Sequence, residues 1–335
     1  MQKLLNKLAA IGIIITLLVV LVVIDVFNSM NTILDVQDRS FINLDRGATI
    51  RTLARDLQRK GHLKHRQYLV VWARLQGVAS KLKAGEYTIN PGDTLTDLLD
   101  RMVSGKVEQY RLTLIEGWSF KEILNEIEYH PQVVKTLGTK EPGKVMEMLG
   151  YDNEHPEGRF YPDTYFIHKN TSDREILKRA HATMRQVLEN EWHQRDQGLP
   201  LKDAYEALIL ASIVEKESAV DEERAKIAGV FINRLKKNMR LQTDPTVIYG
   251  MGDIYKGDIR FRDLRRDTPY NTYTRKGLPP TPIAIPGVAS IKAVLHPEET
   301  DALYFVAYGD GSGRHYFSAS LQEHEKAVNQ YQKKQ

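Results

Sequence analysis

The most apolar stretch of the chain lies close to its N-terminus. Residues 8–24 (LAAIGIIITLLVVLVVI) carry no charge, and Val26 and Phe27 extend the apolar run beyond Asp25. The length of this run approaches the ~20 residues with which an α-helix spans a bilayer. We therefore expect a transmembrane helix over residues 8–27.

The charges before this run predict its orientation. Lys3 and Lys7 precede the apolar residues, so the positive-inside tendency leaves residues 1–7 in the cytoplasm and the rest of the chain outside. The alternative is a cleaved signal peptide, which would have a shorter apolar core followed by an A-x-A-like site. The run ends instead in DVFNSMNT, and we expect an uncleaved anchor.

A short pattern occurs three times after a polar stretch, residues 28–44, that we interpret as a linker. Each copy has a glycine, a Thr or Ser two residues later, and then apolar residues at helical spacing. A hydroxyl at that point can accept a hydrogen bond from the first-turn N–H groups, so helices should begin after Thr49, Thr94 and Ser119. The copies are unequally spaced, which argues against a solenoid.

Residues 45–108 combine these helix starts with strand-like segments. A second helical pattern (HRQYLVVWARLQ) and a strand-like segment (KAGEYTIN) lie between the first two copies. The order strand, two helices, strand is that of a small glycan-binding module of the LysM kind. Many small α+β units share this order, so the pattern alone leaves both interpretations open.

Residues 109–335 predict a larger mixed α+β domain. A strand (EQYRLTLIEG) is followed by long helices at 172–192 and 203–237, a β-hairpin around DGSG and a closing amphipathic helix. Residues 238–287 are rich in Pro, Gly, Tyr, Asn and Thr and have little periodicity. A loop of this length is usually functional or disordered, and its tyrosines favour an ordered groove.

Composition excludes several classes of site. The chain has no cysteine, so disulfides, thiolate nucleophiles and zinc–thiolate centres are absent. Its net charge is +4, without a dense basic stripe interleaved with aromatic residues, so we expect no nucleic-acid partner. The histidines are scattered, and His62 and His65 lack a third ligand at a recognisable spacing. We predict no metal and no cofactor.

Two glutamates, Glu215 and Glu217, end the apolar segment ASIVEKES, and on a helix they point about 200° apart. The helical neighbours of Glu217 include Leu210, Ile213, Val214, Val220 and Asp221, whereas those of Glu215 are Leu208 and the small Ala211, Ser212, Ser218 and Ala219. Burial among bulky apolar groups raises the pKa of a carboxyl, as a general acid requires. We therefore favour Glu217 over Glu215. The alternative is that both are solvated residues that pair with Lys216 or Arg224.

The chain resembles the YceG-like family of endolytic murein transglycosylases in the order and spacing of five sequence blocks. These are ASIVEKES, ERAKIAGVFINRL, LQTDPTVIYGMG, YNTYTRKGLPPTPIAIPG and LHPEETDALYFV, with EGRFYPDTY at 157–165 before them. The N-terminal anchor and the LysM-like module fit the same family. IAIPG at 283–287 departs from the commoner I-x-N-P-G, so a role for a loop asparagine is in doubt there.

The resemblance implies a lyase that cuts peptidoglycan within its glycan strands. The bond between N-acetylmuramic acid and N-acetylglucosamine would be broken, leaving a 1,6-anhydro-muramyl end. The catalytic glutamate would be the second in the E-K-E motif, Glu217. The family also implies an inner-membrane protein with a periplasmic catalytic domain, beside the penicillin-binding-protein synthases, that terminates glycan polymerisation.

One carboxyl suffices for such a reaction, because the C6 hydroxyl of the muramyl residue is tethered beside the anomeric carbon and serves as the nucleophile. Glycan binding needs aromatic platforms and fixed polar groups. Our candidates are Gln242, Thr243, Asp244, Tyr249, Tyr270, Asn271 and Tyr273. The alternatives are that Asp244 caps a helix that begins with Pro245, and that the tyrosines pack in the core.

Two other functions compete with this prediction. An anchored scaffold would bind peptidoglycan without cutting it, although it would not need an intact E-K-E motif. A hydrolytic muramidase would use Asp244 as a second carboxylate beside Glu217.

Overall fold

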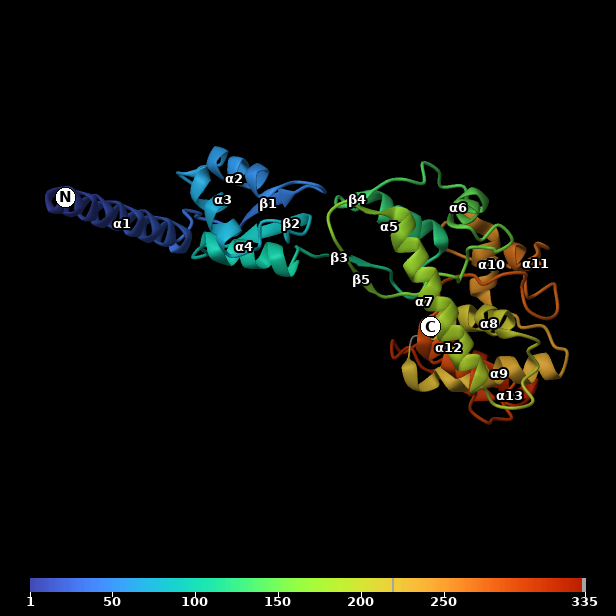
Figure 1. Cartoon of the computed structure of the whole chain (residues 1–335). Helices are drawn as coiled ribbons and strands as arrows, with labels where there is room; N and C mark the ends of the chain where they lie inside the picture. Colours follow the sequence, from blue (N-terminus) through green and yellow to red (C-terminus); the bar gives the residue numbers. More distant parts are fainter. Residues whose placement is uncertain (219, 333–335) are drawn as a thin grey trace. The chain divides into compact units, whose positions relative to one another are not determined.

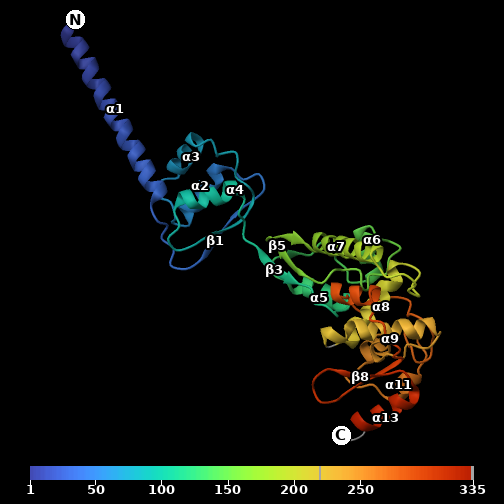
Figure 2. The ribbon, with the colours of Figure 1, turned by 90° about the horizontal axis from the view of Figure 1, so that it is seen from below.

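The computed structural model of the chain describes residues 1–218 and 220–332, which divide into two units (Figures 1 and 2). The first unit comprises Met1–Tyr110 together with Phe166–Asn170, and the second comprises Arg111–Tyr165 and the chain from Thr171 onward. Helices and short strands occur in both units, which confirms the predicted mixed α+β class.

The first unit contains most of the predicted strand–helix–helix–strand segment. Its elements are α1 (Gln2–Asn31), β1 (Ser40–Leu44), α2 (Ile50–Arg59), α3 (Arg66–Leu75), β2 (Gly85–Ile89) and α4 (Leu95–Ser104). β1 and β2 pair antiparallel, with Ile42 opposite Tyr87. This order agrees with the prediction, and glycan binding by this unit remains a prediction.

The second unit is larger and mostly helical. Its elements are β3 (Tyr110–Thr113), α5 (Phe120–Tyr129), β4 (Val133–Val134), α6 (Pro142–Leu149), β5 (Thr164–Ile167), β6 (Thr171–Ser172), α7 (Asp173–His193), α8 (Ala204–Glu217), η1 (Asp221–Glu223), α9 (Arg224–Lys236), α10 (Asp244–Met251), η2 (Gly252–Ile254), α11 (Phe261–Arg265), α12 (Val288–Leu295), β7 (Tyr304–Ala307), β8 (His315–Ser318) and α13 (Leu321–Tyr331). β3 pairs with β5, β4 with β6, and β7 with β8; Tyr110 of β3 and Phe166 and Ile167 of β5 belong to the first unit. The predicted hairpin and closing helix are both present.

The three predicted helix starts are confirmed. The hydroxyls of Thr49, Thr94 and Ser119 accept hydrogen bonds from the N–H groups three residues later, at 3.3, 3.1 and 3.4 Å. At α4 and α5 the acidic third residue also accepts from the N-cap N–H, which completes a capping box. Two otherwise unpaired N–H donors are thereby satisfied at each of these two helix ends.

The end of the N-terminal helix belongs to the core of the first unit. α1 is long and apolar enough to cross a membrane, and it continues beyond the predicted span of 8–27. Val26 and Met30 are buried in the same cluster as the inner faces of α2, α3 and α4. Residues 28–44, predicted as a linker, are instead structured, because buried Met30 and Leu34 and strand β1 fall within them.

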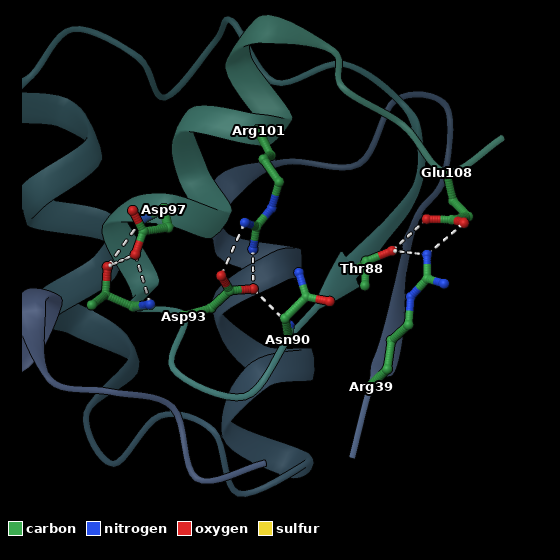
Figure 3. Close-up of polar contacts among 8 residues, drawn as sticks. Arg39, Thr88, Asn90, Asp93, Asp97, Arg101 and Glu108 are labelled. Atoms are coloured by element: carbon green, nitrogen blue, oxygen red, sulfur yellow. Dashed lines mark hydrogen bonds and ion pairs between the residues drawn. The ribbon is translucent and has the colours of Figure 1, made fainter. Parts of the chain in front are cut away.

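Hydrogen bonds and ion pairs surround the C-terminal end of β2 (Figure 3). Arg101 on α4 donates to both carboxylate oxygens of Asp93, at 3.1 and 2.5 Å. Arg39 donates to Thr88 at 3.3 Å and to Glu108 at 2.6 Å. These arginines of the first unit are therefore neutralised within the unit.

The core of the second unit is built around α8. Residues 207–214 are all buried, so this helix is apolar on every side and packs against α7, α9 and α12. The predicted single helix over 203–237 is wrong, because α8 ends at Glu217 and α9 begins at Arg224. Ser218 is extended, and its hydroxyl donates to the Val220 carbonyl at 2.7 Å, a local bond that competes with continued helix.

Candidate active site

A groove of about 550 Å³ opens beside the C-terminal end of α8 in the second unit. Its lining comes from Glu217, from α9, from the segment 241–244 that leads into α10, and from Tyr273. The hairpin β7–β8 and helix α13 complete the lining. Ligand pockets usually measure roughly 300–1,000 Å³, so the groove has room for part of a chain-like ligand.

Glu217 is the last residue of α8, at the point where the chain leaves the core. Its side chain is half-buried, and its Oε1 accepts a hydrogen bond from the hydroxyl of Thr243. Thr243 is itself buried and is the N-cap residue of α10, but its hydroxyl is directed to Glu217 and not to the helix. The carboxyl is therefore fixed by one donor from a distant segment.

The surroundings of Glu217 favour its protonated form. Burial raises the pKa of the Glu217 carboxyl, and the negative charge of Asp244 acts in the same direction. The Thr243 hydrogen bond and the nearby His315 oppose this rise only in part. The pKa of Glu217 is therefore above its ordinary value, the condition for a carboxyl that donates a proton at neutral pH.

Segment 241–244 is held in an unusual backbone conformation. Gln242 has φ of +52°, a left-handed value that non-glycine residues rarely adopt. Its N–H donates to the Thr272 carbonyl at 3.2 Å. Buried Arg234 donates to the Leu241 carbonyl at 2.8 Å and to Gln242 Oε1 at 3.4 Å. Strain of this kind clusters at ligand sites, and here it presents Gln242 to the groove.

Asp244 and Tyr273 face each other across the groove lining. The Tyr273 hydroxyl donates to Asp244 Oδ1 at 2.6 Å. Burial raises the pKa of Tyr273, and the bond to Asp244 adds to the effect. The N-cap residue of α10 is Thr243 and the helix begins at Asp244, so the alternative in which Asp244 is the cap of this helix is not observed. Its carboxylate remains close to Glu217.

The other three candidates lie outside the groove lining. Tyr249 donates to a carboxyl in the interior, and its ring packs edge-to-face on Tyr270, with 4.8 Å between centroids. Tyr270 shares a hydrogen bond with Thr281 at 2.9 Å. Buried Asn271 donates to the backbone carbonyls of residues 263, 264 and 266 and accepts from the Tyr273 N–H. These side chains order the long loop that carries Tyr273.

Several groove residues were not predicted from the sequence. His315 on β8 lines the groove, and its ring and its N–H contact the Glu223 carboxylate, with the closest ring distance 2.9 Å. Tyr304 lines the groove with the Arg234 guanidinium over its ring at 5.0 Å. A hairpin pattern predicts strands and says nothing of what they face, so no local signal could find these residues.

A buried carboxyl lies behind the loop. Glu157, from the EGRFYPDTY block, accepts from the Phe120 N–H at 2.8 Å and from the Tyr249 hydroxyl at 2.9 Å. Burial raises the pKa of Glu157 to about 7, although both hydrogen bonds oppose the rise. It is not among the groove-lining residues, so its contribution is to join α5 to α10.

Glu215 points away from the groove, as the helical angle predicts. Its Oε2 accepts from the Gly287 N–H at 3.0 Å and from the Ser290 hydroxyl at 2.7 Å. Both donors lie at the N-terminus of α12, where a carboxylate is stabilised by the helix dipole. Glu215 therefore stabilises the junction between the IAIPG loop and α12.

A metal centre is not evident in the described part of the chain. Over residues 1–218 and 220–332, no group of three or more His, Asp or Glu side chains could hold a metal ion.

Comparison with known proteins gives consistent matches. The model of the YceG-like family matches residues 42–330. An endolytic murein transglycosylase of Bacillus subtilis (strain 168) is 33% identical over 308 residues, 87% of this chain and 84% of the relative. One of Streptococcus pneumoniae serotype 2 (strain D39 / NCTC 7466) is 26% identical over 87% of this chain and 58% of the relative. The crystal structure of a yceG-like protein from Listeria monocytogenes has a TM-score of 0.53 and 30% identity, covering 87% of this chain and 99% of its own.

Proposed function

The chain belongs to the YceG-like family, and on that premise we propose that it is an endolytic murein transglycosylase, a lyase, whose catalytic acid is Glu217. The observation that carries the assignment of Glu217 is a half-buried carboxyl of raised pKa on the wall of a groove. The bond cut is that between N-acetylmuramic acid and N-acetylglucosamine, within a peptidoglycan strand.

The first step is proton donation. Protonated Glu217 gives its proton to the glycosidic oxygen as the bond from that oxygen to the anomeric carbon breaks. Positive charge then develops on the sugar ring, as in glycosidases generally. The nearby carboxylate of Asp244, held by Tyr273, stabilises that charge.

The second step closes the sugar ring on itself. The C6 hydroxyl of the muramyl residue attacks the anomeric carbon, and the Glu217 carboxylate takes the proton of that hydroxyl. The acid is thereby regenerated, no water is consumed, and a 1,6-anhydro end remains. The Thr243 hydroxyl donates to Glu217 and stabilises its anionic form between the two steps.

The rest of the chain supports a place at the cell envelope. We propose that α1 crosses the inner membrane with residues 1–7 in the cytoplasm, as Lys3 and Lys7 indicate. The groove then acts outside, on strands made by the penicillin-binding-protein synthases, and ends their growth. The strand–helix–helix–strand order of the first unit supports a second, LysM-like contact with glycan.

The test is cleavage of intact glycan strands by the purified full chain in detergent. The expected products carry ends lighter by one water than hydrolytic ends. Glu217→Gln should cut roughly 10²–10⁴-fold more slowly, the usual contribution of a general acid. The matched control, Glu215→Gln, should retain most activity per folded molecule, because Glu215 bonds to α12 and not to the groove. A Glu217→Gln protein as fast as the parent would overturn the assignment.

A hydrolytic muramidase is the second candidate, since Asp244 lies in the groove with Glu217. Such an enzyme would release reducing muramic acid ends, and Asp244→Asn would then abolish cleavage as fully as Glu217→Gln. A scaffold would release no product at all. Product mass therefore separates all three functions.

A further inference from the structure

A strongly basic helix pair follows the N-terminal helix in the first unit. Residues 46–83, which contain α2 and α3, include ten Lys or Arg residues and a single acidic residue, Asp56. The net charge of the whole chain is only +4. Positive charge is therefore concentrated in this stretch to a degree that the overall composition conceals.

Three of these basic residues line a groove of about 370 Å³ between α2 and α3, namely Arg51, Arg55 and Arg66. The groove has no acidic side chain in its lining. Arg39 and Arg101 of the same unit pair with carboxylates (Figure 3), but within the described residues the groove arginines form no ion pair. Guanidinium groups without carboxylate partners are suited to phosphate oxygens, which they bind bidentately.

Helix α3 lies beside the last turns of α1, directly after the apolar run. The Tyr68 hydroxyl donates to Asp25 at 2.6 Å, and Trp72 packs edge-to-face on Phe27 with 6.0 Å between centroids. Both views place α3 next to the C-terminal end of α1 (Figures 1 and 2). With α1 in a bilayer, α3 is held at the depth where hydrocarbon gives way to headgroups.

The outer face of α3 carries two exposed apolar side chains among its polar ones. Val71 is 46% exposed and Leu75 is 75% exposed, and the exposed Arg74 lies between them in sequence. Exposed apolar side chains among arginines, with a tryptophan nearby, are the composition of helices that lie in a membrane interface. A purely aqueous surface would gain nothing from them.

We propose that the α2–α3 face binds the anionic phospholipid headgroups of the membrane that α1 crosses. Arg51, Arg55 and Arg66 contact lipid phosphates, and Val71 and Leu75 enter the boundary of the acyl chains. The proposal rests on the proposed membrane anchoring by α1. It assigns to the first unit a lipid partner in addition to glycan.

The experiment uses full-length protein in lipid nanodiscs. The chain has no cysteine, so Gln76→Cys, at the exposed C-terminal end of α3, carries a single fluorophore. Lipids with a nitroxide on the headgroup quench it when α3 lies on the surface. Quenching is expected to be at least twofold stronger in discs that contain phosphatidylglycerol than in pure phosphatidylcholine. It should return to the phosphatidylcholine level in about 1 M salt, where the Debye length is only about 3 Å.

A charge variant and a matched control separate this site from general attraction. Changing Arg51, Arg55 and Arg66 to Gln should reduce the equilibrium for surface contact on the order of 100-fold, since each basic residue near an anionic surface contributes roughly fivefold. The control changes Lys178, Lys236 and Lys237 to Gln, which removes the same charge from exposed positions of the second unit. The control should quench like the parent.

Three outcomes would overturn the proposal. Quenching that is equal in both lipid mixtures, or unaffected by the triple Arg variant, removes the lipid site. A fluorophore that responds to soluble glycan strands in phosphatidylcholine discs, and not to phosphatidylglycerol, makes the face a glycan site. A separate label at Leu17→Cys, quenched by nitroxides deep in the acyl chains, reports whether α1 is inserted. Absence of that signal removes the anchoring on which the proposal rests, whereas loss of the lyase activity alone leaves it standing.

Discussion

Glu217 combines burial with a single hydroxyl donor at the end of α8. Burial disfavours the carboxylate, and the Thr243 hydrogen bond favours it, with burial the larger effect. The proposed role of Glu217, in which it gives a proton and then retakes it, needs both influences on its pKa. The balance makes Thr243 a positioning residue whose loss should change the pH dependence more than the maximum rate.

Thr243→Val tests this balance through the pH profile of cleavage. In the proposed mechanism activity requires protonated Glu217, so activity is expected below the Glu217 pKa and should be lost as the pH rises through it. The valine variant lacks the bond that stabilises the carboxylate, so the pKa rises further and the alkaline limb moves to higher pH. The low-pH rate should stay within about tenfold of the parent. Thr243→Ser, which keeps the hydroxyl, should restore the parental limb, and a shift to lower pH in the valine variant would contradict the assignment.

Glu215 illustrates how a neighbouring carboxyl can serve structure alone. Glu215→Ala removes the acceptor for Gly287 and Ser290 at the start of α12, so the free energy of unfolding should fall by about 1–2 kcal/mol. Thermal unfolding measures the loss, and Glu222→Ala, at an exposed position beyond α8, is the control that should change little. If Glu215→Ala also lowered the cleavage rate per folded molecule by tenfold or more, Glu215 would take part in the reaction.

At the scale of elements, one buried carboxyl links two helices that approach the site from different parts of the chain. Glu157 accepts from the first residue of α5 and from Tyr249 on α10. Because α10 begins at Asp244 in the groove, the position of this helix depends on a group that titrates near neutrality.

The raised pKa of Glu157 predicts a pH-dependent stability. Its pKa is about 7 in the folded chain against an ordinary value of 4.5, so the folded state binds more protons between these values. The contribution of Glu157 to the free energy of unfolding is fully present below pH 4.5. It declines by about 3 kcal/mol as the pH rises to the pKa that Glu157 has in the folded chain. Glu157→Gln should remove this slope. Unfolding midpoints of parent and variant across that range are the measurement, and parallel curves would contradict the prediction.

Helices and turns that are marked by neighbouring residues in the sequence could be predicted, whereas the points at which helices end were harder to predict. Hydroxyl caps at Thr49, Thr94 and Ser119 and the turn residues of the β7–β8 hairpin act through neighbours in sequence, so they could be found. The break after Glu217 could not, because residues 218–223 contain no Pro or Gly that would mark the end of a helix. Val220 and Asp221 were counted as helical neighbours of Glu217, but they lie beyond the helix end. The choice of Glu217 depended in part on those neighbours.

Only the part of the candidate site that carries sequence motifs could be predicted. Glu217, Gln242, Asp244 and Tyr273 line the groove, and Thr243 contacts Glu217. The part of the lining that contains Tyr304 and His315 comes from the hairpin β7–β8, which lies further along the chain than all four of these residues. Tertiary packing brings these segments together, and no periodicity within either segment contains that information.

At the scale of the whole molecule, the C-terminal end of α1 belongs to the core of the first unit. A chain that begins at Thr32 lacks Val26 and Met30, both buried, whereas one that begins at Asp25 keeps them. The shorter chain should lose about 2–5 kcal/mol of stability in the first unit, the usual effect of removing a large buried side chain. Hydrogen exchange over residues 50–102 measures this loss, with α8 of the second unit as the internal control. Equal protection in both chains would show that α1 is dispensable to the core.

This shared core has a consequence for how a membrane would act on the protein. A domain on a flexible linker is insensitive to the tilt of its membrane helix, whereas with α1 in a bilayer, as proposed, a tilt of α1 would be transmitted to the first unit through Val26 and Met30. The expected span of residues 8–27 measures about 30 Å as a helix, close to the thickness of a typical hydrocarbon core. A bilayer thinner or thicker than this length would change the tilt of α1 or deform around it. With α1 in a bilayer, the thickness of that bilayer would then set the angle between the first unit and the membrane surface.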